Sequence, residues 1–263
     1  MDTINWIRNI VKVKNDLTVS GLILPGSNNS ASYMVRPGKR VNCFSLDSSA
    51  LYQEDSIYDQ LKKGVRMLYI RVLLDPRTKR LRTHSRSQNV DFDAVLKQLK
   101  AFLLISKDVV FVQLIAHDQS AAHAIKLAMR NSLPDVITEI SNATALNETK
   151  IENLLKNQKR VVIISCPVRI NSTKDLMNFK TDAPVFAAAK QFDILLYQRK
   201  PKAVSFDRKS FKSEFNKTFS DFVFAHEHDT LKQINAVLFD FATSSDMIKR
   251  LILMSYLRCG IIQ

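Results

Sequence analysis

The sequence is poor in glycine, cysteine and tryptophan, and each shortage excludes a class of protein. Its 263 residues include five glycines, three cysteines and one tryptophan. Neither common glycine-rich phosphate-binding motif, G-x-G-x-x-G or G-x-x-x-x-G-K-[ST], is present, so nucleotide binding loses its main support. Cys43, Cys166 and Cys259 are too few and too scattered for a disulfide framework or a zinc site. We therefore expect buried thiols in a reducing compartment.

Long apolar runs are also missing. No run of about 18 apolar residues predicts a membrane-spanning helix, and the N-terminal segment lacks the basic and apolar regions of a signal peptide. These absences predict a cytoplasmic or nuclear protein, with peripheral attachment to a membrane left open. Because 46% of the residues are hydrophobic and no linker or internal repeat appears, we expect one domain over 1–263, with a helical extension at 1–16.

Positive charge is in excess. The formal net charge is +14 and the isoelectric point is near 9.7, which favours anionic partners: a phosphoinositide membrane, nucleic acid or an acidic protein. One basic cluster contains Arg77, Lys79, Arg80, Arg82 and Arg86, and a second lies between 199 and 212. A solvated surface without a specific partner is the alternative. Nucleic acid is the less expected partner, because aromatic residues do not interleave with the cations.

Short apolar runs alternate with segments of helical periodicity. The predicted strands cover 19–24, 65–74, 109–115, 161–165, 194–197 and 236–241. The predicted helices cover 92–103, 121–129 and 245–256, the last with Ser245 as its N-cap. Gly26 and Gly64 are predicted to mark turns. Near-continuous apolar strands separated by helices indicate a parallel sheet, and so an α/β fold that is either a (β/α) barrel or a doubly wound sheet.

Three segments carry a resemblance to a known family. Leu22–Ser30 reads L-I-L-P-G-S-N-N-S, Ser56–Arg71 reads S-I-Y-D-Q-L-K-K-G-V-R-M-L-Y-I-R, and Leu81–His84 reads L-R-T-H. In this order they resemble the X domain of phosphatidylinositol-specific phospholipases C, densely over 17–115 and thinly thereafter. The resemblance implies a TIM-like (β/α) barrel, irregular or incompletely closed.

The catalytic residues of the family are only partly matched. In that family a histidine deprotonates the inositol 2-hydroxyl, which attacks the phosphodiester, and a second histidine protonates the leaving oxygen. The resemblance places the first histidine at Asn28, whose amide cannot accept a proton near neutral pH. It places a family carboxylate at Tyr69, and Asn29 at a position where the family also allows asparagine. Losing a general base typically costs about 10²–10⁴-fold in rate, so no catalytic residue is expected to be functional.

The phosphate-binding half of the motif is retained. By resemblance, Arg71 is the phosphate-stabilising arginine and His84 the general acid, with Arg82 beside it as a further anion-binding residue. Asp240 matches an aspartate that supports the first histidine. Because Arg71 and Tyr69 replace carboxylates of the calcium-dependent members, we expect no calcium, no other metal and no cofactor. A structural ion pair of Arg71 with Asp75 or Asp240 is the alternative, and Asn28 and Asn29 are alternatively simple turn formers.

Together these residues predict a catalytically inactive phospholipase-C-like protein. It would bind an anionic membrane or inositol phosphate headgroups through a basic pocket or surface. The alternative is a structural protein that self-assembles from the barrel as a homo-oligomer or larger assembly, and residual phosphodiesterase activity through His84 and another base is a third reading. The abundance of asparagine, lysine and isoleucine also predicts an AT-rich genome, such as that of a virus or parasite.

Overall fold

The computed structural model describes residues 1–34, 53–83, 90–166, 169–172, 193–197, 234–239 and 246–262, with the backbone alone for 34, 169–172 and 193–197. The helices are α1 (Trp6–Val13), α2 (Ile57–Lys62), α3 (Phe92–Ile105), α4 (Gln119–Ser132), α5 (Ala143–Glu148), α6 (Ile151–Lys156) and α9 (Met247–Arg258), with short 3₁₀ turns η1 (Val19–Gly21) and η2 (Ser32–Met34). The strands are β1 (Leu24–Ser27), β2 (Met67–Leu74), β3 (Leu81–Thr83), β4 (Val90–Asp91), β5 (Val110–Ala116), β6 (Ile137–Ile140), β7 (Val161–Ile164), β8 (Arg169–Ser172), β9 (Asp193–Tyr197) and β10 (Ala236–Phe239).

The strands form one sheet whose main path is parallel. Its order is β6-β7-β5-β2-β1-β10-β9-β8, and β3 and β4 add antiparallel pairs beside β2. Within the described ranges β6 and β8 are the two ends of this path and are not hydrogen-bonded to each other. The sheet is therefore a parallel α/β sheet that hydrogen bonds do not close, in keeping with an incompletely closed barrel.

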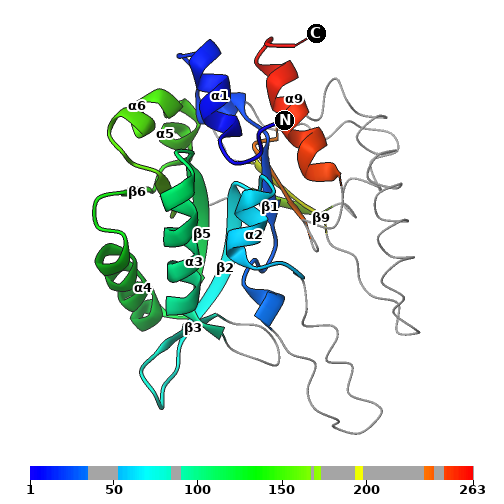
Figure 1. Ribbon diagram of the computed structural model, residues 1–263. Coiled ribbons are helices and arrows are strands. Elements are labelled where there is room, and N and C mark those ends of the chain that lie inside the picture. Colours follow the sequence, from blue (N-terminus) through cyan, green and yellow to red (C-terminus); the bar gives the residue numbers. More distant parts are fainter. Residues whose placement is uncertain are drawn as a thin grey trace, which may run out of the picture.

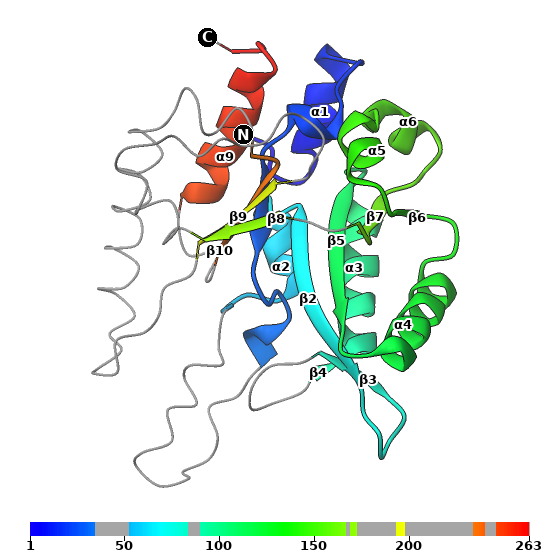
Figure 2. The same ribbon diagram turned by 180° about the vertical axis from the view of Figure 1, so that it is seen from behind.

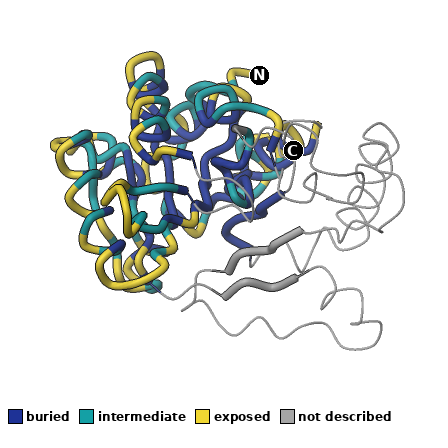
Figure 3. Tube along the Cα trace, turned by 90° about the horizontal axis from the view of Figure 1, so that it is seen from below, coloured by how far each residue is buried: buried dark blue, intermediate teal, exposed yellow. Residues whose placement is uncertain are grey.

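Helices α2 and α3 cover one face of the sheet, and α1 and α9 lie together at one end (Figure 1). The view from behind shows the opposite face of the strands in front of the same helices (Figure 2). Phe92, Val95, Leu99 and Phe102 of α3 are buried as the helical spacing predicts. The buried residues gather at the centre of the described part of the chain and the exposed ones at its rim (Figure 3).

The first strand differs from its prediction. Within the run 19–24, Val19–Gly21 form the turn η1, and β1 begins only at Leu24 and continues through Pro25, Gly26 and Ser27. The pairing of β1 with β2 starts only at Gly26 opposite Met67, so the missing N–H of Pro25 falls before that pairing begins. Gly26 therefore lies in a strand rather than in the predicted turn.

The other predicted boundaries agree more closely. Gly64 adopts a φ of 110°, which confirms the predicted turn, and a side chain there would meet Ile252 at 2.8 Å. Helix α9 begins at Met247 with Asp246 as its N-cap, while the predicted cap Ser245 lies outside the described residues. The single-domain organisation stays a prediction.

Helix α1 is anchored by a buried ion pair. The Arg66 Nε donates to Asp108 Oδ2 at 2.9 Å, and both side chains are fully buried. Asp108 also accepts the backbone N–H groups of Ile7 and Arg8, in the first turn of α1, at 3.2 and 2.7 Å. Arg66 donates further to the carbonyl oxygens of Thr3 and Ile4. The pair thereby ties the N-terminal helix to the chain that enters β2 and β5.

Candidate functional site

The carboxyl end of β1 is held close to both neighbouring strands. A Cβ at Gly26 would lie 2.3 Å from Leu238 Cδ2 and 3.0 Å from Met67 Cβ. A larger residue at this position would force Leu238 to shift and would crowd Met67. The loop that follows β1, and with it Asn28, is therefore drawn in between β10 and β2.

Asn28 is fixed through its backbone. Its N–H donates to the Phe239 carbonyl oxygen at 2.9 Å, and its own carbonyl oxygen accepts from Gln53 Nε2 at 2.8 Å. Gln53 also donates to the Phe239 carbonyl oxygen, and Asn28 is 1% exposed. The residue at the predicted base position is therefore a buried carboxamide with no capacity to take up a proton near neutral pH.

The next two residues tie this loop to β2. Asn29 has a left-handed φ of 45°, as expected of a turn-forming asparagine. The Ser30 N–H donates to the Tyr69 carbonyl oxygen at 3.0 Å, and Ser30 Oγ accepts the Tyr69 N–H at 3.0 Å. Gln60 Nε2 donates to the Ser30 carbonyl oxygen at 2.9 Å. The loop after β1 is thus hydrogen-bonded to Phe239 of β10 and to Tyr69 of β2, and Tyr69 lies beside it.

Tyr69 and Arg71 lie on the same face of β2 because strand residues alternate. The Arg71 guanidinium carbon lies 5.9 Å from the centroid of the Tyr69 ring, within the range of a cation–π contact. Tyr69 is 7% exposed, whereas Arg71 is exposed. The Tyr69 ring, which stands where the family has a carboxylate, therefore contacts the Arg71 guanidinium without neutralising its charge.

Arg71 makes no ion pair with any described residue. Asp75, one of its two candidate structural partners, instead forms an ion pair with Arg82, with 3.2 Å between Arg82 Nε and Asp75 Oδ2. Arg82, which was predicted as a further anion-binding residue, is therefore paired with the Asp75 carboxylate at the other end of the β2–β3 connection. Asp240, the other candidate partner, lies outside the described residues, as do His84 and Arg86 and the second basic cluster between 199 and 212.

Gln113 lies next to Tyr69 on β5. The pairing of β2 with β5 sets Tyr69 opposite Gln113 and Arg71 opposite Ile115, so the four residues share one face of the sheet. Gln113 is 5% exposed, and its buried Oε1 accepts no hydrogen bond from the described residues. A buried acceptor without a partner is unusual in a folded protein. The sequence pattern could not reveal this acceptor, nor the roles of Gln53, Ser30 and Gln60, since each depends on which distant strands are neighbours.

One described histidine also lies at this end of the sheet. His117 follows β5, and its N–H donates to the Val72 carbonyl oxygen at 2.9 Å. Its Nδ1 lies 3.5 Å from Asp118 Oδ2, and its side chain is largely exposed. The pKa of Asp118 is held below its ordinary value, mainly because the carboxylate caps α4 by accepting the Ala121 N–H.

Neither a metal cluster nor a membrane span is found in the part of the chain that the structure describes. No group of three or more histidine, cysteine, aspartate or glutamate side chains there could hold a metal ion. No helix there is long and apolar enough to cross a bilayer. The described part of the chain therefore offers neither a metal-binding cluster nor a membrane-spanning helix.

Comparison with known proteins gives a match in three dimensions. No model of a known protein family matches the chain, and no curated protein matches it. A structure of the phosphatidylinositol-specific phospholipase C of Staphylococcus aureus, from work on the modulation of its membrane binding, has a TM-score of 0.65 at 13% identity, covering 97% of each chain. The enzyme of Listeria monocytogenes has a TM-score of 0.60 at 15% identity, covering 97% of this chain and 99% of that one. The chain therefore has the fold of the bacterial phosphatidylinositol-specific phospholipases C, which confirms the predicted α/β fold of TIM-barrel type, here not closed by hydrogen bonds.

Proposed function

We propose that this protein is a catalytically inactive relative of these phospholipases, and that it binds phosphorylated inositol headgroups at the carboxyl ends of β1 and β2. The observation that carries the proposal is Arg71. It is an exposed cation that no described carboxylate neutralises, and it stacks on Tyr69 beside the loop of Asn28. A guanidinium in this state can bind a phosphate oxygen through charge-assisted hydrogen bonds.

The chemistry of the neighbouring side chains supports inactivity. Asn28 and Gln113 are amides, and a phenol such as that of Tyr69 has an ordinary pKa of about 10. None of the three can take the proton from an inositol hydroxyl near neutral pH. Among the described residues His117 is the imidazole at this end of the sheet, so of these it is the candidate base for any residual turnover in which His84 acts as the acid.

Gln113 Oε1, which accepts no hydrogen bond from the described residues, supports a polyhydroxylated ligand. A buried carbonyl oxygen without a donor gains a hydrogen bond when a hydroxyl group reaches it. Arg71 would contact the phosphate of such a ligand. Gln113, which lies opposite Tyr69 on the neighbouring strand β5, would contact a ring hydroxyl. Inositol phosphates combine these two groups.

Calorimetric titration with myo-inositol 1-phosphate tests the proposal. Arg71→Ala should weaken binding by about 10- to 100-fold, as expected for a lost charge-assisted hydrogen bond. Arg130→Ala is the matched control, because Arg130 is an exposed arginine on α4. Equal affinities of the wild type and Arg71→Ala would contradict the site. In a separate assay with phosphatidylinositol, release of cyclic inositol phosphate with diacylglycerol as the leaving group, abolished by His117→Ala or His84→Ala, would contradict the inactivity.

The structural alternative has an observation of its own. Leu253 and Leu257, one turn apart on α9, are 42% and 45% exposed, and Val13 at the end of the neighbouring α1 is 69% exposed. Exposed apolar residues of this kind occur in homo-oligomer interfaces. If the chain assembles through them, Leu253→Ser with Leu257→Ser should yield a monomer in light scattering after size-exclusion chromatography. A wild type that is already monomeric would contradict this alternative.

A further inference from the structure

The connection between β2 and β3 is a short, well-ordered hairpin. Leu74 pairs with Leu81, and the Asp75 N–H donates to the Arg80 carbonyl oxygen at 2.9 Å, which extends the ladder by one step. Asp75 Oδ1 accepts the N–H groups of Arg77 and Thr78 at 2.9 and 3.2 Å. These bonds, with Pro76 inside the turn, fix the backbone at the tip.

Lys79 occupies a position that favours glycine. Its φ is 55°, in the left-handed region, where the turn meets the returning strand. A residue with a Cβ is held there at a cost of about 1–2 kcal/mol, which glycine or asparagine would largely avoid. The chain therefore keeps a cation at the tip where glycine or asparagine would stabilise the turn, and strained backbone of this kind is concentrated at functional sites.

No described carboxylate pairs with the cations at the tip. Arg77, Lys79 and Arg80 are exposed and make no ion pair with the described residues. The one acidic residue of the hairpin, Asp75, is already used by the turn and by Arg82. The tip is thus a compact group of three unneutralised charges, which we call the basic tip (Arg77, Lys79 and Arg80).

The basic tip projects from the same end of the protein as the proposed headgroup site. Both views of the ribbon show the hairpin extending beyond the carboxyl end of β2, with α1 at the opposite end (Figure 1, Figure 2). Arg71 lies on β2 four residues before the hairpin turn begins at Asp75. A flat anionic surface that contacts the basic tip would therefore also face the end of the sheet that carries Arg71.

We propose that the basic tip docks the protein on the surface of an anionic lipid bilayer, whatever the headgroup, and so presents the Arg71 end of the sheet to the membrane. The orientation rests on the proposed function, but the docking does not. A bilayer fits better than nucleic acid, because the hairpin offers one point of charge rather than a track, and 75–83 contain no aromatic residue for base stacking. Cations near an anionic leaflet are attracted over about one Debye length.

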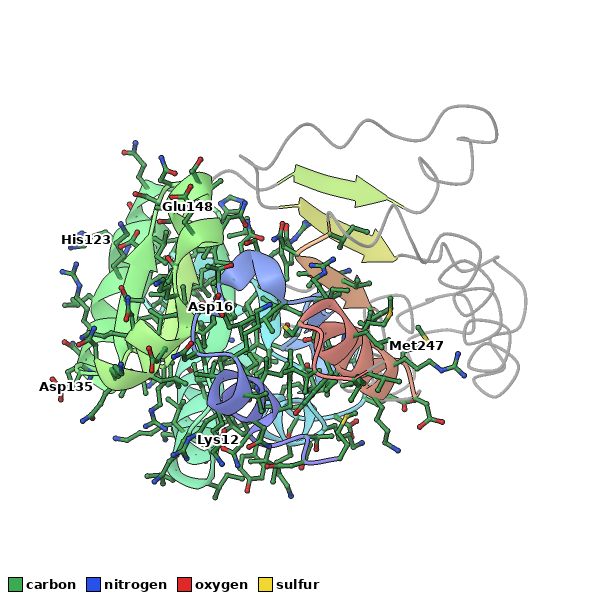
Figure 4. The ribbon with its side chains drawn as sticks, turned by 90° about the horizontal axis from the view of Figure 1, so that it is seen from above. Lys12, Asp16, His123, Asp135, Glu148 and Met247 are labelled. Carbon is green, nitrogen blue, oxygen red and sulfur yellow. The ribbon has the colours of Figure 1, made fainter. Side chains whose placement is uncertain are left out.

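Co-sedimentation with vesicles of phosphatidylcholine, with and without phosphatidylserine, tests the docking. Each cation near the surface is worth roughly a factor of five in affinity, so Arg77→Gln with Lys79→Gln and Arg80→Gln should weaken binding on the order of a hundredfold. The matched control is Lys12→Gln with Lys100→Gln and Lys107→Gln. These exposed lysines make no ion pair with the described residues, and Lys12 lies on α1 at the far end, seen from above in Figure 4.

Strong loss in the tip variant, with little change in the control, is the expected result. Equal losses in both variants, or none in either, would overturn the proposal, because net charge or another surface would then account for binding. Loss of duplex DNA binding in the tip variant, without binding of the wild type to the vesicles, would overturn the assignment to lipid. Phosphatidylserine contains no inositol, so failure here leaves the titration of the Arg71 site with inositol phosphate unaffected.

Lys79→Gly separates charge from folding. It removes one cation and relieves the left-handed conformation, so it should bind the anionic vesicles about fivefold more weakly while Tm stays equal or rises. Undiminished binding would contradict the docking role of Lys79. A lower Tm would contradict the reading of its conformation as a cost accepted for charge.

Discussion

Asp108→Asn removes the charge opposite Arg66 and nearly preserves the side-chain shape. Both partners of the ion pair are fully buried, so the arginine left behind would have no carboxylate and no access to water. Burial lowers the pKa of Arg66, while the neighbouring Asp108 opposes that shift. The variant removes this opposing interaction and also weakens the cap on the first turn of α1.

The magnitude follows from the geometry. Two unit charges about 4 Å apart attract by roughly 4 kcal/mol at an effective dielectric constant near 20. Breaking a buried pair by removing one partner costs about 3–5 kcal/mol in measured cases. A domain is typically stable by only about 5–15 kcal/mol, so Asp108→Asn should remove a large part of the free energy of unfolding.

Trp6 provides the assay. It is the single tryptophan of the chain, it lies on α1, and its Nε1 donates to the Gly64 carbonyl oxygen at 3.1 Å. Its fluorescence during urea unfolding therefore reports the helix that the ion pair anchors. The control is Asp135→Asn, which changes an exposed carboxylate (Figure 4) and should shift stability by no more than about 0.5 kcal/mol. A loss below about 1 kcal/mol in Asp108→Asn would refute the reasoning.

Three further predictions concern the site and its surroundings. Tyr69→Phe should leave the affinity for inositol phosphate unchanged in calorimetry, because no described residue forms a hydrogen bond with the Tyr69 hydroxyl group. Tyr69→Asp should weaken binding, because the new carboxylate would pair with Arg71. Equal affinities of these two variants would contradict the stacking role of the ring. Gly26→Ala should destabilise the fold by about 1–3 kcal/mol in urea unfolding, since its Cβ would overlap Leu238, and an unchanged midpoint would refute the close approach of the strands. The pKa of Asp75 lies below its ordinary value because the N–H groups of Thr78 and Arg77 donate to it. The stability that this carboxylate provides is present above the unfolded pKa of about 3.9 and is lost as the pH falls through the lower folded pKa; Asp75→Asn should flatten this part of the acid titration of Tm, and an unaltered titration would contradict the turn geometry.

The helices were largely predictable from sequence, because local spacing determines which side chains they bury. The pattern of α3 gave its buried face, and the helix ends within about two residues of the expected positions. Strand β1 was misplaced because its conformation depends on β2 and β10. Glycine is favoured at position 26 because Leu238 of β10 and Met67 of β2 approach it closely. Proline is tolerated at position 25 because the pairing of β1 with β2 begins one residue later, at Gly26. No window of the sequence contains that information.

The candidate site was predictable only where the family motif supplied it. Asn28, Tyr69 and Arg71 were named from the motif, and the structure brings them to one end of two adjacent strands. The stacking of Arg71 on Tyr69 could have been suspected from their spacing of two residues in a strand. The buried oxygen of Gln113 could not, because only the pairing of β2 with β5 places it beside Tyr69. Inactivity and headgroup binding stay predictions.

A single experiment tests the central claim most directly. Purified protein is mixed with vesicles of phosphatidylcholine, with and without phosphatidylinositol, and bound protein and released cyclic inositol phosphate are measured in the same sample. The account predicts binding that increases with phosphatidylinositol, falls by about 10- to 100-fold in Arg71→Ala, and releases no product. Product release by the wild type, or binding that is indifferent to both phosphatidylinositol and Arg71, would contradict it.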